Sequence, residues 1–465
     1  MILPFNWFNK MFAKKGTHSP NWIASGLASA ALALALLPVA GCGDTYRPVV
    51  AGISPVGPTA QPTKYAVATS DPCYGASLTT CSTPGLVTFV DFSGDTIMIT
   101  AELGVGPQYL ALNPGGTEGF SLNRDGSLNS FQIATSLITN QVLSSTLLTG
   151  ANPNSILPGS INTYVTQPGR GSLAVMTGTP ISLKQEIPVA AGPVYVVGIP
   201  SAKRFYEISQ AATSNQITSI DPNTNLVLNT ISLPAASAPI YGIMSTDGNR
   251  VYILDQGTNS VSVINVQSDQ LDSFILPGGS TPTSSIPVGK SPVWVDFYTN
   301  GNELFVVNAG DSTLSLINVP LCNTIAQPTN PNCSTTNPTD STSFGQTLAT
   351  VPLGAGENPF MVTVLQDGTQ AFVANTGGGS VSPSVSVVSM TSNTVIKTIN
   401  FDGLAGDGPA CTPNFIASTT GEPTGKVYVT CANNQTLTII RTDTDTLEAT
   451  LPLQGAGIMV RMTSQ

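Results

Sequence analysis

Short apolar runs separated by polar turns fill the chain from about residue 63 to residue 465. Several of these turns carry Asp-Gly or Asn-Gly pairs, as at Asp247-Gly248, Asn300-Gly301 and Asp367-Gly368, which favour hairpins. No stretch beyond residue 41 sustains the period of about 3.6 residues that marks an amphipathic helix. The pattern therefore predicts an all-β structure.

A repeated unit organises these runs. Each unit opens on a proline with an apolar run, and three further short strands follow, separated by polar turns. The opening prolines recur at intervals of 40 to 67 residues, at Pro107, Pro153, Pro193, Pro239, Pro292, Pro359 and Pro413. Four short strands at this spacing predict one antiparallel blade of a β-propeller.

The second strand of each unit is apolar at consecutive positions, as in Val251 to Leu254 and Leu304 to Val307. Such a strand is covered on both faces, whereas a one-sided sheet alternates apolar and polar residues. In a propeller, each blade is sandwiched between two others, so the pattern favours that fold over an open sheet.

The ring closes, on this interpretation, through the C-terminal strand. The first unit begins directly at Lys64 to Ala68 without an opening strand, and residues 456 to 462 resemble an opening strand with Gly457 in the place of the proline. The C-terminal strand should therefore complete the N-terminal blade. The seven prolines and Gly457 predict eight blades, with seven as the alternative because the unit from Asn152 to Val189 is weak.

Several segments resemble the bacterial YVTN-type propeller repeat: Val427 to Thr430 with Asn433, Phe305 to Asn308, Phe372 to Asn375, and Tyr252 to Asn265. The resemblance is clear over about residues 190 to 465 and degenerate before that. It implies a β-propeller, usually of seven blades. Relatives include surface-layer or cell-envelope binding proteins and nucleic-acid binders, and lactonases share the fold class.

The first 41 residues have the order of a secretory signal. They contain Lys10, Lys14 and Lys15 and no acidic residue, and an Ala/Leu-rich run follows. Val39-Ala40-Gly41-Cys42 then resembles the lipobox of bacterial lipoproteins, which implies cleavage before Cys42 and lipidation of its thiol. Gly43 implies sorting to the outer membrane. An uncleaved membrane anchor is the alternative.

These features predict three parts: a signal peptide at 1–41, a lipidated cysteine with a Pro-rich tether at 42–62, and a propeller at 63–465. The chain has 16 basic and 26 acidic residues, a net charge of -10, and cleavage would remove three of the lysines. A nucleic-acid partner or an anionic lipid surface needs clustered basic residues, so neither is expected. Membrane contact should run through the lipid alone, with a protein or envelope polymer as the partner.

The one histidine, His18, lies in the predicted signal. Histidine-ligated metal or haem and Ser-His-Asp hydrolysis are therefore not expected of the mature chain, and we predict no cofactor and no metal. Six of the seven cysteines remain after Cys42. They fall into three near pairs without the CxxC units of a zinc site, and in an exported chain they predict disulfides: Cys73 with Cys81, Cys322 with Cys333, and Cys411 with Cys431.

Few residues suggest chemistry. Asp221 to Asn225 has the alternating oxygens of a calcium loop but lacks its glycine and distal Glu, so a capped turn is the preferred interpretation. Asn308, Asn375, Asn433 and Asn434 are expected at left-handed turn positions. Trp294 and Asp296 replace apolar residues in an opening strand. A ligand site could use them for stacking and hydrogen bonding, but packing between blades with a satisfied carboxylate is the preferred interpretation.

The sequence thus predicts an outer-membrane lipoprotein whose propeller is a non-catalytic binding or scaffold module. A lactonase-like hydrolase, with carboxylates and a metal in the axial funnel, is one alternative. A surface-layer or adhesion component is the other. The enzyme alternative requires several acidic residues that converge at one face, and the linear sequence shows no such group.

Overall fold

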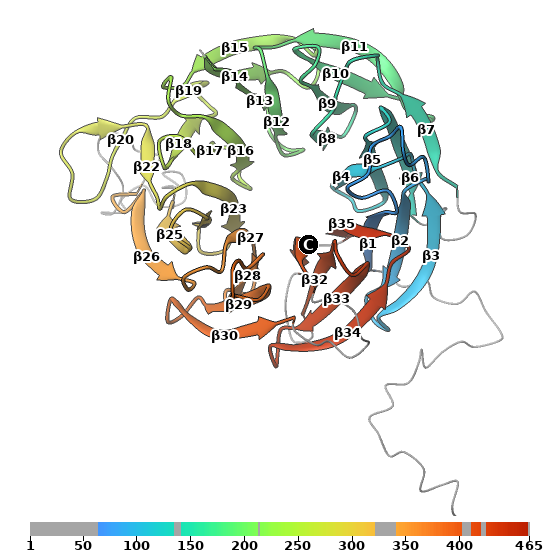
Figure 1. The fold of residues 1–465 in the computed structure, drawn as a ribbon. Coiled ribbons are helices and arrows are strands. Elements are labelled where there is room, and N and C mark those ends of the chain that lie inside the picture. Colours follow the sequence, from blue (N-terminus) through green and yellow to red (C-terminus); the bar gives the residue numbers. More distant parts are fainter. Residues whose placement is uncertain are drawn as a thin grey trace, which may run out of the picture. The chain divides into compact units, whose positions relative to one another are not determined.

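The computed structural model describes residues 64–133, 141–212, 214–320, 341–401, 411–419 and 425–463. They lie in the compact unit Gln61–Gln465. Eight antiparallel sheets surround a central axis as an eight-bladed β-propeller (Figure 1). The predicted all-β fold and the count of eight are confirmed, and the alternative of seven blades is wrong. The predicted signal, Cys42 and the tether up to residue 62 fall outside the described residues.

In blades one to four, the strands run from the axis to the rim in chain order, except that the last strand of the chain is innermost in blade one. Blade one contains β35 (Ala456–Met462), β1 (Tyr65–Asp71), β2 (Leu86–Asp91) and β3 (Thr96–Glu102); blade two contains β4 (Pro107–Leu112), β5 (Glu118–Asn123), β6 (Ser127–Gln132) and β7 (Leu143–Thr146); blade three contains β8 (Ile156–Pro158), β9 (Thr163–Gln167), β10 (Ser172–Thr177) and β11 (Ser182–Pro188); blade four contains β12 (Pro193–Val197), β13 (Phe205–Gln210), β14 (Asn215–Ile220) and β15 (Val227–Ser232).

Blades six to eight repeat this order, whereas blade five has a divided outer strand. Blade five contains β16 (Pro239–Met244), β17 (Arg250–Asp255), β18 (Ser260–Asn265), β19 (Gln270–Leu271) and β22 (Ser285–Pro287), with the inserted hairpin β20 (Phe274–Ile275) and β21 (Pro282–Thr283); blade six contains β23 (Pro292–Tyr298), β24 (Glu303–Asn308), β25 (Thr313–Asn318) and β26 (Gln346–Pro352); blade seven contains β27 (Pro359–Val364), β28 (Gln370–Asn375), β29 (Ser384–Ser389) and β30 (Thr394–Asn400); blade eight contains β31 (Pro413–Ser418), β32 (Lys426–Cys431), β33 (Thr436–Arg441) and β34 (Thr446–Pro452).

Six of the seven opening prolines begin an innermost strand, because proline at this first position removes no hydrogen bond needed farther along the ladder. Pro153 is the exception, since β8 begins only at Ile156 and has three residues. After each of the six prolines the register shifts by one residue, for example between Pro292 and Trp294. Each bulge changes the direction of the side chain two positions after the proline.

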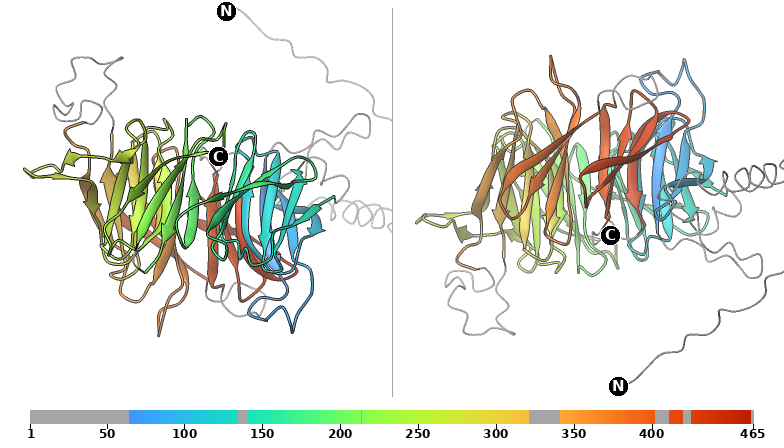
Figure 2. Two further views of the ribbon diagram at one scale, coloured as in Figure 1. Left: turned by 90° about the horizontal axis from the view of Figure 1, so that it is seen from above. Right: turned by 90° about the horizontal axis from the view of Figure 1, so that it is seen from below.

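Burial falls from the second strand of each blade to the rim. Every residue of β17 and β32 is buried, whereas β11 and β30 are mostly exposed. The second strands, with their consecutive apolar residues, are thus covered on both faces by the neighbouring blades, as predicted. Figure 2 shows the blades from the side, with their strands running between the two faces of the ring.

The ring closes between its last and first strands. Strand β35 pairs antiparallel with β1, with Val460 opposite Ala68 and Met462 opposite Ala66. The prediction that the C-terminal strand completes the N-terminal blade is confirmed.

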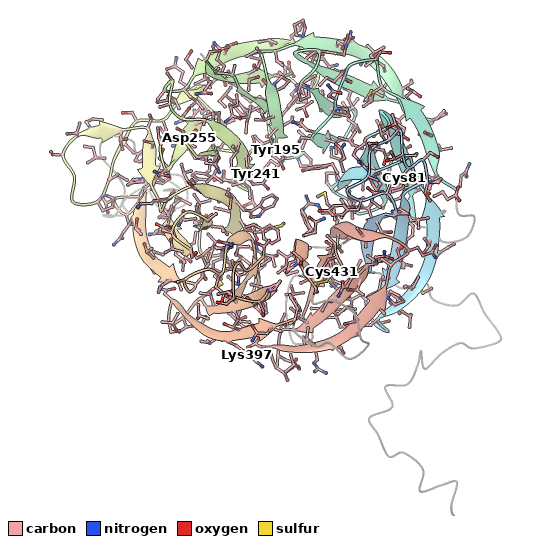
Figure 3. All side chains as sticks on the ribbon, viewed as in Figure 1. Cys81, Tyr195, Tyr241, Asp255, Lys397 and Cys431 are labelled. Atoms are coloured by element: carbon pink, nitrogen blue, oxygen red, sulfur yellow. A yellow bond between two sulfur atoms is a disulfide. The ribbon has the colours of Figure 1, made fainter. Side chains whose placement is uncertain are left out.

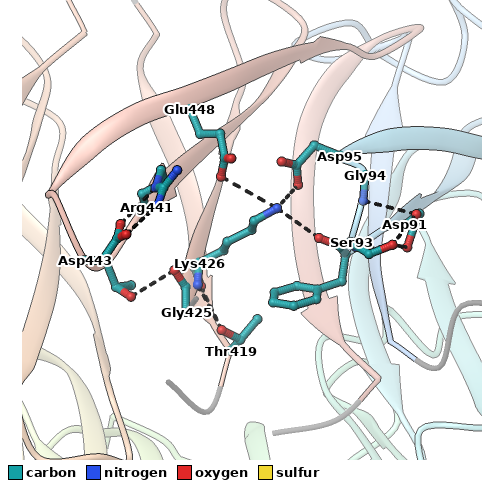
Figure 4. Close-up of polar contacts among 12 residues, drawn as sticks. Asp91, Ser93, Gly94, Asp95, Thr419, Gly425, Lys426, Arg441, Asp443 and Glu448 are labelled. Carbon is teal, nitrogen blue, oxygen red and sulfur yellow. Dashed lines mark hydrogen bonds and ion pairs between the residues drawn. The ribbon is translucent and has the colours of Figure 1, made fainter. Parts of the chain in front are cut away.

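A buried ion pair reinforces this closure between blades eight and one (Figure 4). The Lys426 ammonium, 4% exposed, lies 2.5 Å from an Asp95 carboxylate oxygen and 3.6 Å from Glu448. It also donates a hydrogen bond of 2.9 Å to the carbonyl of Phe92 and lies 5.1 Å from the centre of that residue's ring.

The Lys426–Asp95 contact is one case of a recurring link between neighbouring blades. In five blades, the turn between the third and fourth strands holds an Asp or Asn with positive φ, a conformation these residues tolerate. In four of them, its side chain accepts a hydrogen bond from the second strand of the preceding blade. The pairs are Lys426 with Asp95, Tyr164 with Asn225, Tyr206 with Asp269, and Gln370 with Asp445.

Two disulfides lie on the face at which the innermost strands begin. Cys73 bonds Cys81 in the loop after β1, and Cys411 bonds Cys431, which ends β32. Both predicted pairs are confirmed, and the third, Cys322 with Cys333, lies outside the described residues. In the described part of the chain, no helix has the length and apolar content needed to span a membrane.

Candidate functional site

The axis of the ring is lined by the residues that follow six of the opening prolines by two positions. Because the bulge after the proline turns this residue away from the blade interior, it faces the axis. Strands β4, β12, β16, β23, β27 and β31 supply Tyr109, Tyr195, Tyr241, Trp294, Met361 and Phe415, and β35 supplies Met459 two positions after Gly457.

Ring contacts confirm this placement. Tyr195 packs against Tyr241 with centroids 4.5 Å apart, and Tyr241 stacks on Trp294 at 4.3 Å. Figure 3 labels Tyr195 and Tyr241 at the inner border of the propeller. Their pKa values are raised because burial disfavours the phenolate, so both remain hydroxyl groups at neutral pH.

Two contacts join blades that are not neighbours. The hydroxyls of Tyr109 in blade two and Tyr195 in blade four lie 3.2 Å apart. Trp294 in blade six meets Phe415 in blade eight edge-on, with centroids 6.0 Å apart. Side chains from such blades meet only near the axis, so these five aromatic residues form a linked series there, which we call the axial aromatic series.

Asp296 lies two residues beyond Trp294 on the same side of β23. One carboxylate oxygen accepts a hydrogen bond of 2.8 Å from the backbone amide of Val364 in the next blade, and the other accepts one of 2.9 Å from the amide of Phe297. Burial raises the pKa of Asp296 to about 6, and these amides and the charge of Arg461 partly oppose that shift. The carboxylate therefore ties β27 to β23.

Arg461 occupies the matching position on β35, two residues beyond Met459. Its guanidinium lies 4.7 Å from the centre of the Phe415 ring, a cation–π contact, and its Nε donates a hydrogen bond of 3.3 Å to the carbonyl of Leu110. The side chain is half-buried. A cation thus ends the axial aromatic series.

A cavity of about 520 Å³ opens beside Arg461. It lies between the turn that joins β4 to β5 and the end of β35. Its lining residues are Ala111 to Gly116 and Arg461 to Thr463. Gly116, with φ of +62°, is required here, because a Cβ atom would stand 1.8 Å from the carbonyl oxygen of Thr463. We call this space the Arg461 cavity.

Two further cavities, of about 430 and 210 Å³, continue along the same face. Asn113 to Gly115 line both the Arg461 cavity and the larger of these, and Gly159 to Asn162 line both of the two. All three are bordered by turns that join the first and second strands of a blade. They therefore form a row on the face at which the innermost strands end, from blade one to blade four.

The other candidates have structural roles. Asp221 accepts a hydrogen bond of 2.8 Å from the amide of Asn223 within a turn, as the preferred interpretation of that segment predicted. Within the described ranges, no three His, Cys, Asp or Glu side chains are grouped closely enough to hold a metal ion.

The prediction that four asparagines adopt left-handed backbone conformations is wrong. Asn308 and Asn375 end β24 and β28 and are fully buried, and each donates a hydrogen bond of 2.9 Å to a serine of the third strand. Asn433 and Asn434 have no positive φ either; in that turn Gln435 does. At Asn308 and Asn375, a side-chain hydrogen bond to a buried serine, and not a left-handed backbone, explains why asparagine occupies the strand end.

The structure brings Trp294 and Asp296 near the axis, where Trp294 packs against other aromatic rings and both Asp296 oxygens accept hydrogen bonds, as the preferred packing interpretation predicted. Sequence reasoning missed Arg461 and the other members of the axial aromatic series. A signal was present, because the prolines at 107, 193, 239, 292 and 413 are each followed two positions later by an aromatic residue. Only the bulge, which the sequence does not show, tells which way that residue faces.

Comparison with known proteins identifies the fold alone. No protein-family model matches the chain, and no curated protein matches it significantly. Dihydro-heme d1 dehydrogenase NirN in complex with DHE aligns with a TM-score of 0.63 and 12% identity, over 86% of this chain and 76% of that one. Apo AztD from Citrobacter koseri aligns with a TM-score of 0.54 and 11% identity, over 86% and 97%.

Proposed function

We propose that this protein is a cell-envelope lipoprotein whose propeller, of the YVTN type, is a non-catalytic binding module. One observation carries the binding role: the Arg461 cavity and its two neighbours form a row on one face, built from short turns on rigid blades. Binding sites are commonly clefts of this size on such scaffolds. The disc surface also suits a protein or envelope polymer as a partner.

The envelope location is supported by the leader and by the cysteines. Residues 1–41 have the composition of a secretory signal, and Val39 to Cys42 resemble a lipobox. The two observed disulfides are typical of an oxidising compartment. The sorting habit implied by Gly43 favours the outer membrane.

Expression of the full chain in a Gram-negative host tests the anchor. We expect mature protein that starts at Cys42, carries lipid by mass spectrometry and fractionates with the outer membrane. Cys42→Ser should appear without lipid. Recovery of the unlipidated chain with residues 1–41 intact would refute the proposal.

A panel of lactones, assayed with and without a chelator, tests the non-catalytic role. We expect no turnover above the rate of the buffer. Turnover that the chelator abolishes would instead support the lactonase-like alternative. Reversible self-association of the purified protein in sedimentation would support the surface-layer alternative.

A further inference from the structure

We propose that Arg461 binds an anion, and that the Arg461 cavity takes a small organic anion: a carboxylate or phosphate on a planar or apolar body. This inference rests on the proposed binding function and names its ligand class. Three features support it: the guanidinium that forms no ion pair, the size and lining of the cavity, and the position of a reporter residue.

Arg461 differs from the other arginines of the described residues in its partners. Five arginines each pair with a carboxylate within 4 Å; the pairs are Arg124 with Asp71, Arg170 with Glu186, Arg204 with Asp269, Arg250 with Asp272, and Arg441 with Asp443. The observed contacts of Arg461 are instead a ring face and one backbone carbonyl.

A guanidinium has five N–H donors in a fixed fork, and only Nε of Arg461 has an acceptor in the described chain. The Asp296 carboxylate interacts with this charge only through space, because both of its oxygens accept hydrogen bonds from backbone amides and it forms no ion pair with the guanidinium. The fork is shaped to bind a carboxylate or phosphate through two parallel hydrogen bonds. Arg461 therefore presents the correct donors for an anion, already held in place by the Phe415 ring.

The size and lining of the cavity indicate what kind of group the anion is attached to. A volume of about 520 Å³ is sufficient for a small molecule rather than for a bare ion. Its lining includes the apolar residues Ala111, Leu112, Pro114 and Met462. These walls favour an apolar or planar body attached to the anionic group. The acidic net charge of the chain disfavours large polyanions, so a small monoanion or dianion fits best.

Trp294 supplies a built-in reporter for the test. Trp294 contacts the Phe415 ring, and the Arg461 guanidinium packs against that same ring. The other two tryptophans of the chain, Trp7 and Trp22, lie in the predicted signal. Tryptophan emission of the mature protein therefore comes from the axial aromatic series alone, and Arg461 contacts that series through Phe415.

The experiment titrates the detergent-solubilised mature protein with benzoate, phenyl phosphate, neutral benzamide and inorganic phosphate, followed by tryptophan emission and calorimetry. We expect benzoate and phenyl phosphate to bind and to change the emission. Benzamide and inorganic phosphate should bind at least about tenfold more weakly, since the first lacks the charge and the second lacks the body. Arg461→Gln should weaken benzoate binding at least about tenfold, and Arg461→Lys should weaken it less.

Arg441→Gln is the matched control, because it removes an exposed arginine that does not line the Arg461 cavity and should leave benzoate binding unchanged. The proposal is overturned if no organic anion binds, if benzamide equals benzoate in the unmodified protein, if inorganic phosphate equals phenyl phosphate, or if Arg461→Gln binds as tightly as the original. The benzamide comparison needs no variant, so it decides even if Arg461→Gln does not fold. Each of these results overturns the ligand assignment alone, whereas lactone turnover or an intact leader overturns the proposed function.

Discussion

Replacing Lys426 with Met should loosen the closure of the ring. Methionine keeps the length and apolar stem of the side chain but removes the ammonium from a site in which Lys426 is 4% exposed, Asp95 8% and Glu448 14%. The two carboxylates then lose a buried cation, and breaking a buried ion pair in this way typically costs about 3–5 kcal/mol. That loss is a large fraction of a normal free energy of unfolding, which is about 5–15 kcal/mol.

Equilibrium unfolding in urea measures the change in free energy, and hydrogen exchange shows where it acts. We expect a lower urea midpoint for Lys426→Met and faster exchange of the amides of β1 and β35, which form the seam, before those of blades four and five. Adding Asp95→Asn should recover part of the loss, because it removes one of the stranded charges and because Asn tolerates the positive φ at this turn.

Arg170→Gln serves as the control, since it breaks a largely exposed pair with Glu186 in blade three, away from the Lys426 cluster. Exposed pairs contribute little, so this variant should unfold close to the original midpoint. If Lys426→Met were no more destabilised than Arg170→Gln, or if exchange increased uniformly around the ring, the buried pair would not hold the seam and the reasoning would be refuted.

Two further predictions concern stability. Burial raises the pKa of Asp255 to about 7, so the stability that this residue contributes is present at low pH and is lost as pH rises from about 4 to 7. Asp255→Asn copies Asn308 of the next blade, so in thermal unfolding it should stabilise the protein by about 1–3 kcal/mol at pH 8 and by much less at pH 5. The reciprocal variant Asn308→Asp should lower stability at pH 8. Equal gains at both pH values would contradict this account. Replacing Cys411 and Cys431 together by Ser opens a loop with a sequence separation of 20 and should cost about 3 kcal/mol in urea unfolding; an unchanged midpoint would show that the bond does not constrain the unfolded chain.

Much of the fold could be predicted from the sequence because its signals are local. Consecutive apolar residues in strands such as β17, and a proline at the start of most units, report burial and strand order directly. Blade three was the weak unit because β8 has three residues and begins after Pro153 rather than at it. Its place in the ring depends on pairing with β9, which is a tertiary property.

The candidate site was only partly predictable for a related reason. Trp294 and Asp296 stood out because they break an apolar pattern within one strand. Arg461 gives no such signal in the linear sequence, since its meaning comes from Phe415 and Leu110, which lie in other blades. The asparagines were misassigned because a polar residue at a strand end suits either a left-handed turn or a buried side-chain hydrogen bond, and composition cannot separate the two.

The pairing of β1 with β35 gives β35 an importance out of proportion to its length. β1 has no inner neighbour until β35, which follows all the other strands of the ring, is synthesised. A chain that lacks β35 would leave the backbone of β1 unpaired along its inner side, as a template for strands of other molecules. Synthesis of β35 is thus the step that removes this exposed edge.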